Sequence, residues 1–236
     1  TGKLMDTEEI VENLNDIFSP KELSGLKIIV TAGASIEQID TVRFISNNSS
    51  GIQGYEIAKS LSSLGAEIIL ITGKTDLKKP KKVKKIEALS GINFYDRIIQ
   101  NCPCDVLISA AAISDWKVKN KTNKKIKKAN KNEIKISFVK NIDVLTNISR
   151  HKKRPKLIIG FSAETSNLIK NSKLKLKEKN CDWIIANDVS NKSIGFDSDF
   201  NEVIIFYKNK NEEKLFMKKK SEISDEIIDR VISQLN

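Results

Sequence analysis

A loop near the start of the sequence carries residue types that bind phosphate. It follows the apolar run from Lys27 to Thr31, which predicts a buried strand, and ends at Ile52, where apolar residues begin to recur at helical spacing. The candidate phosphate-binding residues are Gly33, Ser49, Gly51 and Gly54. Glycines let the backbone approach phosphate oxygens, and the N–H groups of a helix N-terminus attract anions. The loop is about twenty residues long, against the usual two to six, so its length indicates function or disorder. Its serines, asparagines and Arg43 favour function.

The elements that would hold this loop alternate between strands and helices. Apolar and alternating patterns predict strands over residues 27–31, 67–72, 83–88, 105–110, 133–139, 157–161, 182–186, 202–207 and 213–217. Helical spacing and capping residues predict helices over residues 7–18, 52–64, 90–100, 143–150, 166–179 and 221–235. This order predicts an α/β fold with a doubly wound, mostly parallel, Rossmann-like sheet, helices on both faces and a late antiparallel hairpin. We expect residues 1–24 to form an N-terminal helix and linker, and residues 25–236 a single α/β domain.

Composition narrows the class of function. The net charge of +11 is compatible with nucleic-acid binding, but lysine occurs in nearly every segment together with many Ile and Asn residues. Compositional bias therefore accounts for most of the charge, and we do not expect a nucleic-acid partner. The longest apolar run, residues 106–113, is too short to span a bilayer, and no signal peptide is recognisable. Three cysteines and the single His151 offer too few ligands for zinc and indicate reduced thiols in a cytoplasmic protein.

Two classes of function are compatible with parts of the sequence. TAGAS after the first strand is similar to a dinucleotide-binding loop, but G-x-G-x-x-G is absent. Tyr55 and Lys59 match the Y-x-x-x-K of short-chain dehydrogenases, yet they fall in the first helix, where they cannot meet a nicotinamide as that family requires. The other alternative is a basic α/β domain that binds nucleotide or nucleic acid without turnover.

Six segments in order resemble one enzyme family. They are DTVRFISNNSSGIQG at 40–54, AAAISDW at 110–116, KIKK at 125–128, KNIDVL at 140–145, GFSAET at 160–165 and ANDVS at 186–190, followed by GFDSDFNEV at 195–203. Residues 26–236 thereby resemble phosphopantothenate–cysteine ligase (phosphopantothenoylcysteine synthetase), the C-terminal half of a bacterial bifunctional protein of coenzyme A biosynthesis. Residues 1–24 look like the segment that joins this half to a flavin-dependent decarboxylase. We therefore expect the ligase part of a fused protein, with no flavin in this part.

The resemblance implies a ligation in two steps. The carboxylate of 4′-phosphopantothenate attacks the α-phosphate of CTP, giving an acyl-cytidylate and pyrophosphate. The amine of L-cysteine then attacks the activated carbonyl and releases CMP. A carboxylate is a poor acylating agent at neutral pH, so the chemistry requires activation of this kind. CTP is thus a co-substrate, and Mg²⁺ is expected with the triphosphate although no dedicated protein cage for it is visible in the sequence.

The same resemblance assigns roles to individual residues. Asn47 steadies the acyl-nucleotide and Lys125 neutralises the reacting phosphate. Arg43 binds the phosphate of phosphopantothenate and reaches into the neighbouring subunit's site, which implies a homodimer with shared sites. Matches to substrate-pocket positions are Ala111, Ala112 and Asp115. Matches to nucleotide positions are Asn141, Ile142, Asp143, Val144, Phe161, Lys175, Lys179 and Asn187.

The segment from 117 to 133 is polar, dense in lysine and without hydrophobic period, so it is predicted to be a mobile loop. Because it carries Lys125, it is also the candidate lid. The first loop departs from the family pattern at four positions: Ala34, Ser35 and Ile36 replace glycine-threonine-arginine, and Gln38 replaces a proline. The missing arginine removes a possible phosphate or structural contact from the first loop. Outside this loop, Trp116 replaces a smaller aromatic residue beside Asp115.

Overall fold

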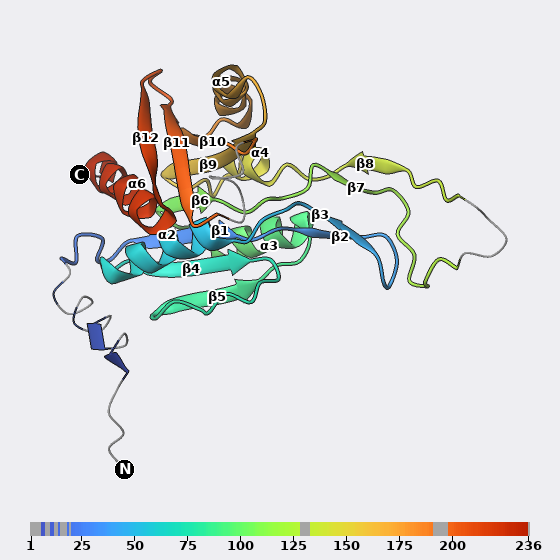
Figure 1. Ribbon diagram of the computed structural model, residues 1–236, viewed down its shortest axis with the longest axis horizontal. Helices are drawn as coiled ribbons and strands as arrows, with labels where there is room; N and C mark the ends of the chain where they lie inside the picture. The colour runs from blue at the N-terminus through green and yellow to red at the C-terminus, as the bar shows by residue number, and fades with distance from the viewer. Residues whose placement is uncertain are drawn as a thin grey trace, which may run out of the picture.

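A computed structural model describes residues 6, 7, 10, 11, 14, 18, 20–127, 133–190 and 198–235. Its centre is an eight-stranded sheet with the order β12-β11-β10-β9-β6-β1-β4-β5 (Figure 1). The bounds of these strands are Lys27–Ala32 for β1, Glu67–Thr72 for β4, Val83–Glu87 for β5, Val106–Ser109 for β6, Leu157–Glu164 for β9, Trp183–Asp188 for β10, Phe200–Tyr207 for β11 and Glu212–Lys219 for β12. These eight strands thus form one continuous sheet.

Six strands of the sheet, in the spatial order β5, β4, β1, β6, β9 and β10, are parallel to one another. Counted along the chain, their spatial order is third, second, first, fourth, fifth and sixth, which is the doubly wound order of dinucleotide-binding folds. β11 and β12 continue the sheet as an antiparallel hairpin. The predicted fold class is confirmed. In such sheets the order reverses between the first and fourth strands, here β1 and β6, and ligands bind outside the carboxyl ends of the strands at that point.

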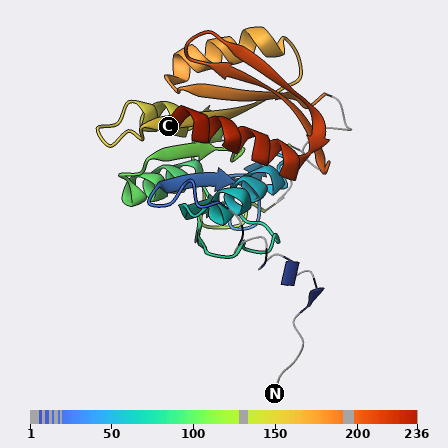
Figure 2. The same ribbon diagram turned by 90° about the vertical axis from the view of Figure 1, so that its left-hand side faces the viewer.

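Helices cover both faces of the sheet, because alternate residues of each strand point to opposite sides. Ile28 and Val30 of β1 face α2 (Ile52–Ser63) and α6 (Lys220–Leu235), which pack against each other in Figure 2. Ile29 faces the opposite side, which is covered by α3 (Gly91–Asn101), α4 (Val144–Ser149) and α5 (Leu168–Lys179). The parallel strands β4, β1, β6, β9 and β10 are buried on both sides and so read as largely apolar runs, whereas the edge strand β5 has only Val83 buried.

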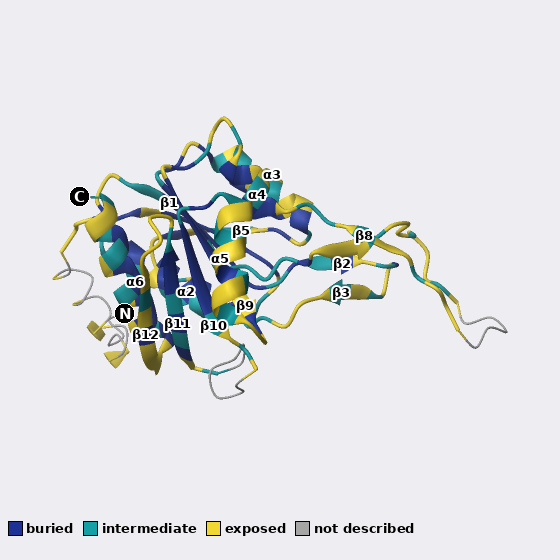
Figure 3. Cartoon of the chain, turned by 90° about the horizontal axis from the view of Figure 1, so that it is seen from above, coloured by how far each residue is buried: buried dark blue, intermediate teal, exposed yellow. Residues whose placement is uncertain are grey.

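Two short antiparallel ribbons leave the domain on the carboxyl side of the sheet (Figures 1 and 3). One pairs β2 (Ile36–Gln38) with β3 (Phe44–Ser46), and the other pairs β7 (Trp116–Val118) with β8 (Phe138–Lys140). Their residues are mostly exposed, in contrast with the buried central strands in Figure 3.

The ribbons correct three details of the predicted elements. The long first loop contains a β-hairpin, because Asp40 Oδ1 accepts hydrogen bonds from the backbone N–H groups of Val42 and Arg43 and closes its turn. The segment predicted as a loop from 117 to 133 begins inside β7, and residues 128–132 lie outside the described residues. The strand predicted over 133–139 is confined to β8, because β7 offers pairing partners only for Phe138–Lys140.

Parts of some predictions fall outside the described residues. Of the helix predicted over 7–18, the described positions 7, 10, 11, 14 and 18 are helical. Of the motif at 195–203, residues 195–197 are not described. The division into a linker and one domain stays a prediction, although Leu23 is already part of the core and its N–H donates to the Leu64 carbonyl at 3.1 Å. Among the helices that the structure describes, none is long and apolar enough to cross a membrane.

Candidate active site

A cavity of about 590 Å³ opens at the carboxyl ends of β6 and β9, next to the point where the strand order reverses. Ten of the residues predicted for the site line it: Asn47, Ala111, Ala112, Asp115, Ile142, Asp143, Val144, Phe161, Lys175 and Lys179. The segments that contribute them are the end of the β2–β3 hairpin, the loop after β6, the start of α4, β9 and α5. The fold thus gathers residues from positions 47 to 179 around one opening.

The predicted glycines do not line this cavity but form the junction between β1 and α2. Gly33 and Gly51 have φ values of 73° and 80°, and a Cβ at Gly51 would lie 3.1 Å from the Gly33 backbone nitrogen. Both conformations favour glycine. A Cβ on Gly54 would lie 2.6 Å from Ala32 Cβ, so this glycine lets α2 pack closely on β1. Ser49, half-buried, precedes this junction.

Lys175 reaches the cavity from α5 and is held by the end of β9. Its Nζ donates to Glu164 Oε1 at 2.6 Å and to Ser162 Oγ at 3.0 Å. Ser162 Oγ donates to the same carboxylate oxygen at 2.7 Å, and Asn171 Nδ2 donates to Oε2 at 3.0 Å. Burial raises the pKa of Glu164, but the hydrogen bonds from Lys175, Ser162 and Asn171 outweigh it and hold the pKa below its ordinary value. The lysine is therefore fixed beside an ionised carboxylate.

Lys179, one turn further along α5, forms a second pair. Its Nζ donates to Asp143 Oδ2 at 2.8 Å, while Asp143 Oδ1 accepts from the Thr146 backbone N–H at 3.0 Å and caps α4. Burial raises the pKa of Asp143, but the Lys179 ammonium and the Thr146 N–H together lower it by more, so the pKa lies below its ordinary value. Lys175 and Lys179 thus present two positive groups to the cavity, as their spacing of four residues predicts.

The wall opposite α5 is built from small residues after β6. Ala112 forms a parallel bridge with Ala34, which brings the loop after β6 against the loop after β1. Ser35 is fully buried, and its Oγ accepts a hydrogen bond from the Ser114 backbone N–H at 2.9 Å. The altered first loop therefore retains a hydroxyl that positions the pocket wall. Asp115 follows and is exposed at the cavity.

Arg43 and Lys125 are not among the residues that line the cavity. Arg43 Nη1 donates to Asp40 Oδ2 at 3.0 Å and to the Ile126 carbonyl at 3.2 Å, while the Ile126 N–H donates to the same carboxylate at 3.1 Å. Burial raises the pKa of Asp40, but backbone N–H groups and the Arg43 charge lower it below its ordinary value. The segment after β7 is thereby fixed to the turn of the β2–β3 hairpin. The exposed Lys125 directly precedes Ile126, whose carbonyl accepts from Arg43.

Two further predicted residues lie near the lining without being part of it. Asn187, half-buried in β10, pairs in register with Ala163, which does line the cavity. Asn141 packs between the pocket segments, and its Nδ2 donates to Glu37 Oε1 and to the Ser114 carbonyl. Sequence reasoning missed Ser162 and Glu164, although both lie in a predicted motif. Their alternation along a strand that leads to Lys175 was the available signal, because residues two apart in a strand share a face.

A magnesium ion needs oxygen ligands, and few carboxylates at the cavity are available to it. Within the described ranges, no group of three or more His, Cys, Asp or Glu side chains is placed to hold a metal ion. Asp143 and Glu164 are engaged by lysines, and Asp115 faces the cavity. This set fits an Mg²⁺ ion held mainly by phosphate oxygens and water, with one protein carboxylate at most.

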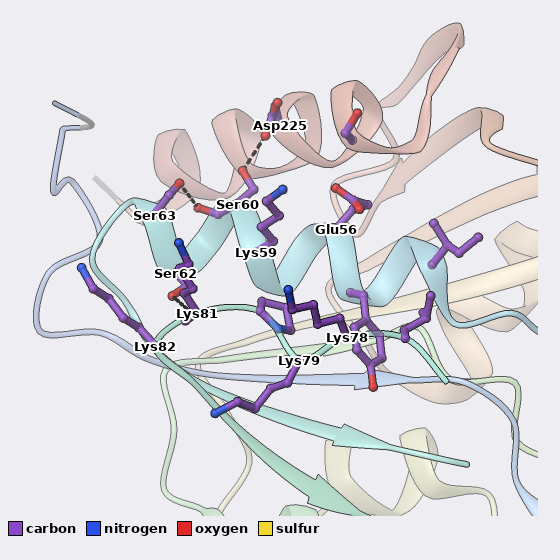
Figure 4. Close-up of a pocket in the computed structure, with 15 residues that line it drawn as sticks. Glu56, Lys59, Ser60, Ser62, Ser63, Lys78, Lys79, Lys81, Lys82 and Asp225 are labelled. Carbon is purple, nitrogen blue, oxygen red and sulfur yellow. Dashed lines mark hydrogen bonds between the residues drawn. The ribbon is translucent and has the colours of Figure 1, made fainter. Parts of the chain in front are cut away.

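A second cavity of about 560 Å³ lies elsewhere, between α2, α6 and the loop before β5 (Figure 4). Lysines from α2 and from that loop surround it: Lys59, Lys78, Lys79, Lys81 and Lys82. Tyr55 also lines it, and the Tyr55 hydroxyl is buried. Tyr55 and Lys59 therefore lie outside the set that lines the cavity at the strand ends, which argues against a dehydrogenase role for them.

Fold and site together define a doubly wound α/β domain with a pocket at the carboxyl ends of its strands that two lysines line, the class that binds nucleotides or other phosphorylated ligands. The family model of the DNA/pantothenate metabolism flavoprotein C-terminal domain matches residues 23–235, and the chain belongs to this family. The resemblance found in the sequence motifs is thereby confirmed.

Individual relatives agree with this membership. The chain is 37% identical over 235 residues to the Coenzyme A biosynthesis bifunctional protein CoaBC of Haemophilus influenzae, covering 99% of this chain and 58% of that protein. It is 36% identical over 230 residues to the protein of the same name from Borreliella burgdorferi, covering 96% and 58%. The crystal structure of the C-terminal domain of such a CoaBC protein matches with a TM-score of 0.77 at 33% identity, over 91% of this chain and 98% of that chain. The chain spans little more than half the length of these curated relatives.

Proposed function

We propose that this chain joins 4′-phosphopantothenate to L-cysteine at the expense of CTP, through an acyl-cytidylate, giving phosphopantothenoylcysteine, CMP and pyrophosphate. The observation that supports it most is the pair Lys175 and Lys179, which lines the cavity at the carboxyl ends of β6 and β9 in a chain that matches the DNA/pantothenate metabolism flavoprotein C-terminal domain. Two ammonium groups there suit a triphosphate, and the cavity of about 590 Å³ has room for a nucleotide.

The chain's residues would divide the work between two ends of the cavity. Lys175, Lys179 and the backbone from Ile142 to Val144 would hold the nucleotide, with Phe161 against it and Asn187 behind. Ala111, Ala112 and Asp115 would line the acyl side, where Asn47 donates to the acyl-nucleotide. Charge develops on the α-phosphate in the first step and on the carbonyl oxygen in the second, so fixed donors and cations stabilise both transition states. Mg²⁺ would enter with the triphosphate and offset its charge.

Arg43 and Lys125 would act from the extension and not from the cavity wall. Both lie where the segment after β7 is bound to the β2–β3 turn, outside the lining of their own chain's cavity. A homodimer in which one protomer's extension reaches its partner's cavity would bring the two cations to the phosphopantothenate and the reacting phosphate. The protein would act in the cytoplasm, with the flavin-dependent decarboxylase on another part of the fused polypeptide.

Pyrophosphate release tests this proposal. The purified chain is mixed with CTP, Mg²⁺ and 4′-phosphopantothenate, with and without L-cysteine, and the series is repeated with ATP. We expect release that requires phosphopantothenate, a preference for CTP, and CMP with the cysteine adduct when cysteine is present. CTP binding without release in a folded protein would contradict the enzyme and favour a nucleotide-binding module, whereas NAD(P)H binding would favour the oxidoreductase.

A further inference from the structure

Glu37 is a buried carboxylate that no expectation assigned to the site. Its side chain belongs to β2 and the residue is 7% exposed. Its Oε1 accepts hydrogen bonds from the Gly91 backbone N–H and from Asn141 Nδ2, both at 2.8 Å. Removing an ionised carboxylate from water is costly unless hydrogen bonds replace the solvent. The first N–H of α3 and the positive end of its dipole supply part of that compensation.

Asn141 uses its side-chain amide within the protein. Nδ2 donates to Glu37 Oε1 and also to the Ser114 carbonyl at 2.9 Å, which accounts for both of its N–H donors. Oδ1 accepts from the Ile142 backbone N–H at 2.9 Å. The Asn141 backbone N–H donates to the Asp115 carbonyl at 2.8 Å. The amide therefore has no donor left for a nucleotide.

The contact between these groups is close-packed. A Cβ at Gly91 would lie 2.8 Å from Asn141 Nδ2, so the start of α3 leaves room for this amide only as glycine. Glu37, Gly91 and Asn141 come from β2, α3 and the segment before α4. Through Ser114 and Asp115, the wall after β6 joins the same junction. Three of the segments that build the cavity therefore meet at Glu37 and Asn141.

We propose that Glu37 is a positioning residue for nucleotide binding. By fixing the Asn141 side chain, it holds the backbone from Ile142 to Val144 at the correct distance from the Ser114–Asp115 wall. Asn141 then contributes through this junction and not by touching the ligand. That the ligand is a nucleotide rests on the proposed function, whereas the junction itself follows from the hydrogen bonds.

Two substitutions at Glu37 separate its hydrogen bonds from its charge. Glu37→Gln keeps an oxygen that can accept from Gly91 and Asn141, whereas Glu37→Ala removes it. We expect Glu37→Ala to raise the KM for CTP about tenfold with kcat changed less than about threefold, because loosened positioning weakens ground-state binding. Glu37→Gln should retain most of the affinity. The matched control is Glu67→Ala, an exposed glutamate at the start of β4. Equal losses in Glu37→Ala and Glu37→Gln, or an unchanged KM in Glu37→Ala, would overturn the proposal.

A double-mutant cycle distinguishes positioning from direct contact. Asn141→Asp puts a carboxylate against Glu37 and should raise the KM at least as much as Glu37→Ala. Adding Glu37→Gln supplies an amide that can donate to Asp at this position, so the double variant should bind CTP better than Asn141→Asp alone. If Asn141 contacted the ligand directly, adding Glu37→Gln would not restore CTP binding to Asn141→Asp. Absence of such a restoration would contradict our inference.

Amide hydrogen exchange gives a readout that does not depend on activity. In Glu37→Ala, the Gly91 and Ile142 amides should exchange faster, while amides in β1 and β4 keep their rates. This result would support the junction even if the unmodified chain releases no pyrophosphate, in which case the proposed function alone fails. Unchanged exchange at both amides in a folded Glu37→Ala protein would refute the positioning role. If Glu37→Ala does not fold, Asn141→Asp takes its place in this comparison.

Discussion

Lys179 Nζ lies 2.8 Å from Asp143 Oδ2, and this contact joins the last turn of α5 to the N-cap of α4. The carboxylate thus serves a lysine and a helix N-terminus at once. Because both residues line the cavity, the pair fixes the position of a positive charge at the cavity wall. A phosphate oxygen can share the ammonium, which has three donors, without breaking the pair.

Lys179→Ala is therefore expected to weaken CTP binding. Under the proposed function it removes one charge-assisted hydrogen bond to the phosphates and releases Asp143, so we expect the Kd to rise about tenfold, the scale of one such bond. Isothermal titration calorimetry with CTP and Mg²⁺ measures the effect. Lys177→Ala, an exposed lysine in the same turn, is the control. Similar losses in the two variants would mean that general charge, and not position, attracts the nucleotide.

Glu164 should make the stability of the fold depend on acid. Its folded-state pKa lies below the ordinary value of 4.5, so its stabilising contribution is complete above about pH 4.5 and is lost as the pH falls through the lower folded-state pKa. Glu164→Gln should remove that part of the dependence. Urea unfolding of both proteins at several pH values between neutrality and the acid range checks this. Parallel curves of unfolding free energy below pH 4.5 would show that Glu164 is not held by Lys175 and Ser162 in solution.

Gly54→Ala is expected to destabilise the fold without touching the cavity. The added methyl would meet Ala32 Cβ at 2.6 Å and the Thr31 carbonyl at 3.0 Å, so α2 must move away from β1. Overpacking of this kind costs about 1–3 kcal/mol, which corresponds to a fall in Tm of roughly 2–4 °C per kcal/mol for a domain of this size. Differential scanning calorimetry measures it. An unchanged or raised Tm would show that the helix can shift at no cost.

The sequence predicts the central sheet well because its strands are buried on both faces. Runs such as Glu67–Thr72 have few polar positions, and their alternation with helices fixes the parallel order. The ribbons were less predictable. Ile36–Gln38 and Trp116–Val118 are three residues long and none of their apolar residues is fully buried, so hydrophobic period carries little signal there. Their positions depend on contacts such as those of Asp40. Its carboxylate accepts from the N–H of Ile126, a residue far along the chain.

The site shows the same division. The spacing of Lys175 and Lys179 on one helix indicates that both can reach one ligand, and the structure places both at the cavity. Their partners could not be inferred in the same way, since Glu164 and Asp143 reach them only through the packing of α5. Asn141 illustrates the opposite case. A motif match marks its position, but only the three-dimensional contacts show that its amide is directed into the protein.

Lys125→Gln tests the role of the extension. If this ammonium offsets charge on the reacting phosphate, its loss should lower turnover about a hundredfold or more, the scale of removing one electrostatic stabiliser, with a smaller change in the KM for CTP. Lys127→Gln is the control, because Lys127 is also exposed and lies on the other side of Ile126. Mixing Lys125→Gln protein with an inactive Asn47→Ala variant examines the shared site. If the extension acts across a dimer, mixed dimers contain one cavity with both Asn47 and Lys125 intact, and activity should recover in part. Near-normal turnover of Lys125→Gln would exclude the assignment, and absence of recovery after subunit exchange would confine each site to a single chain.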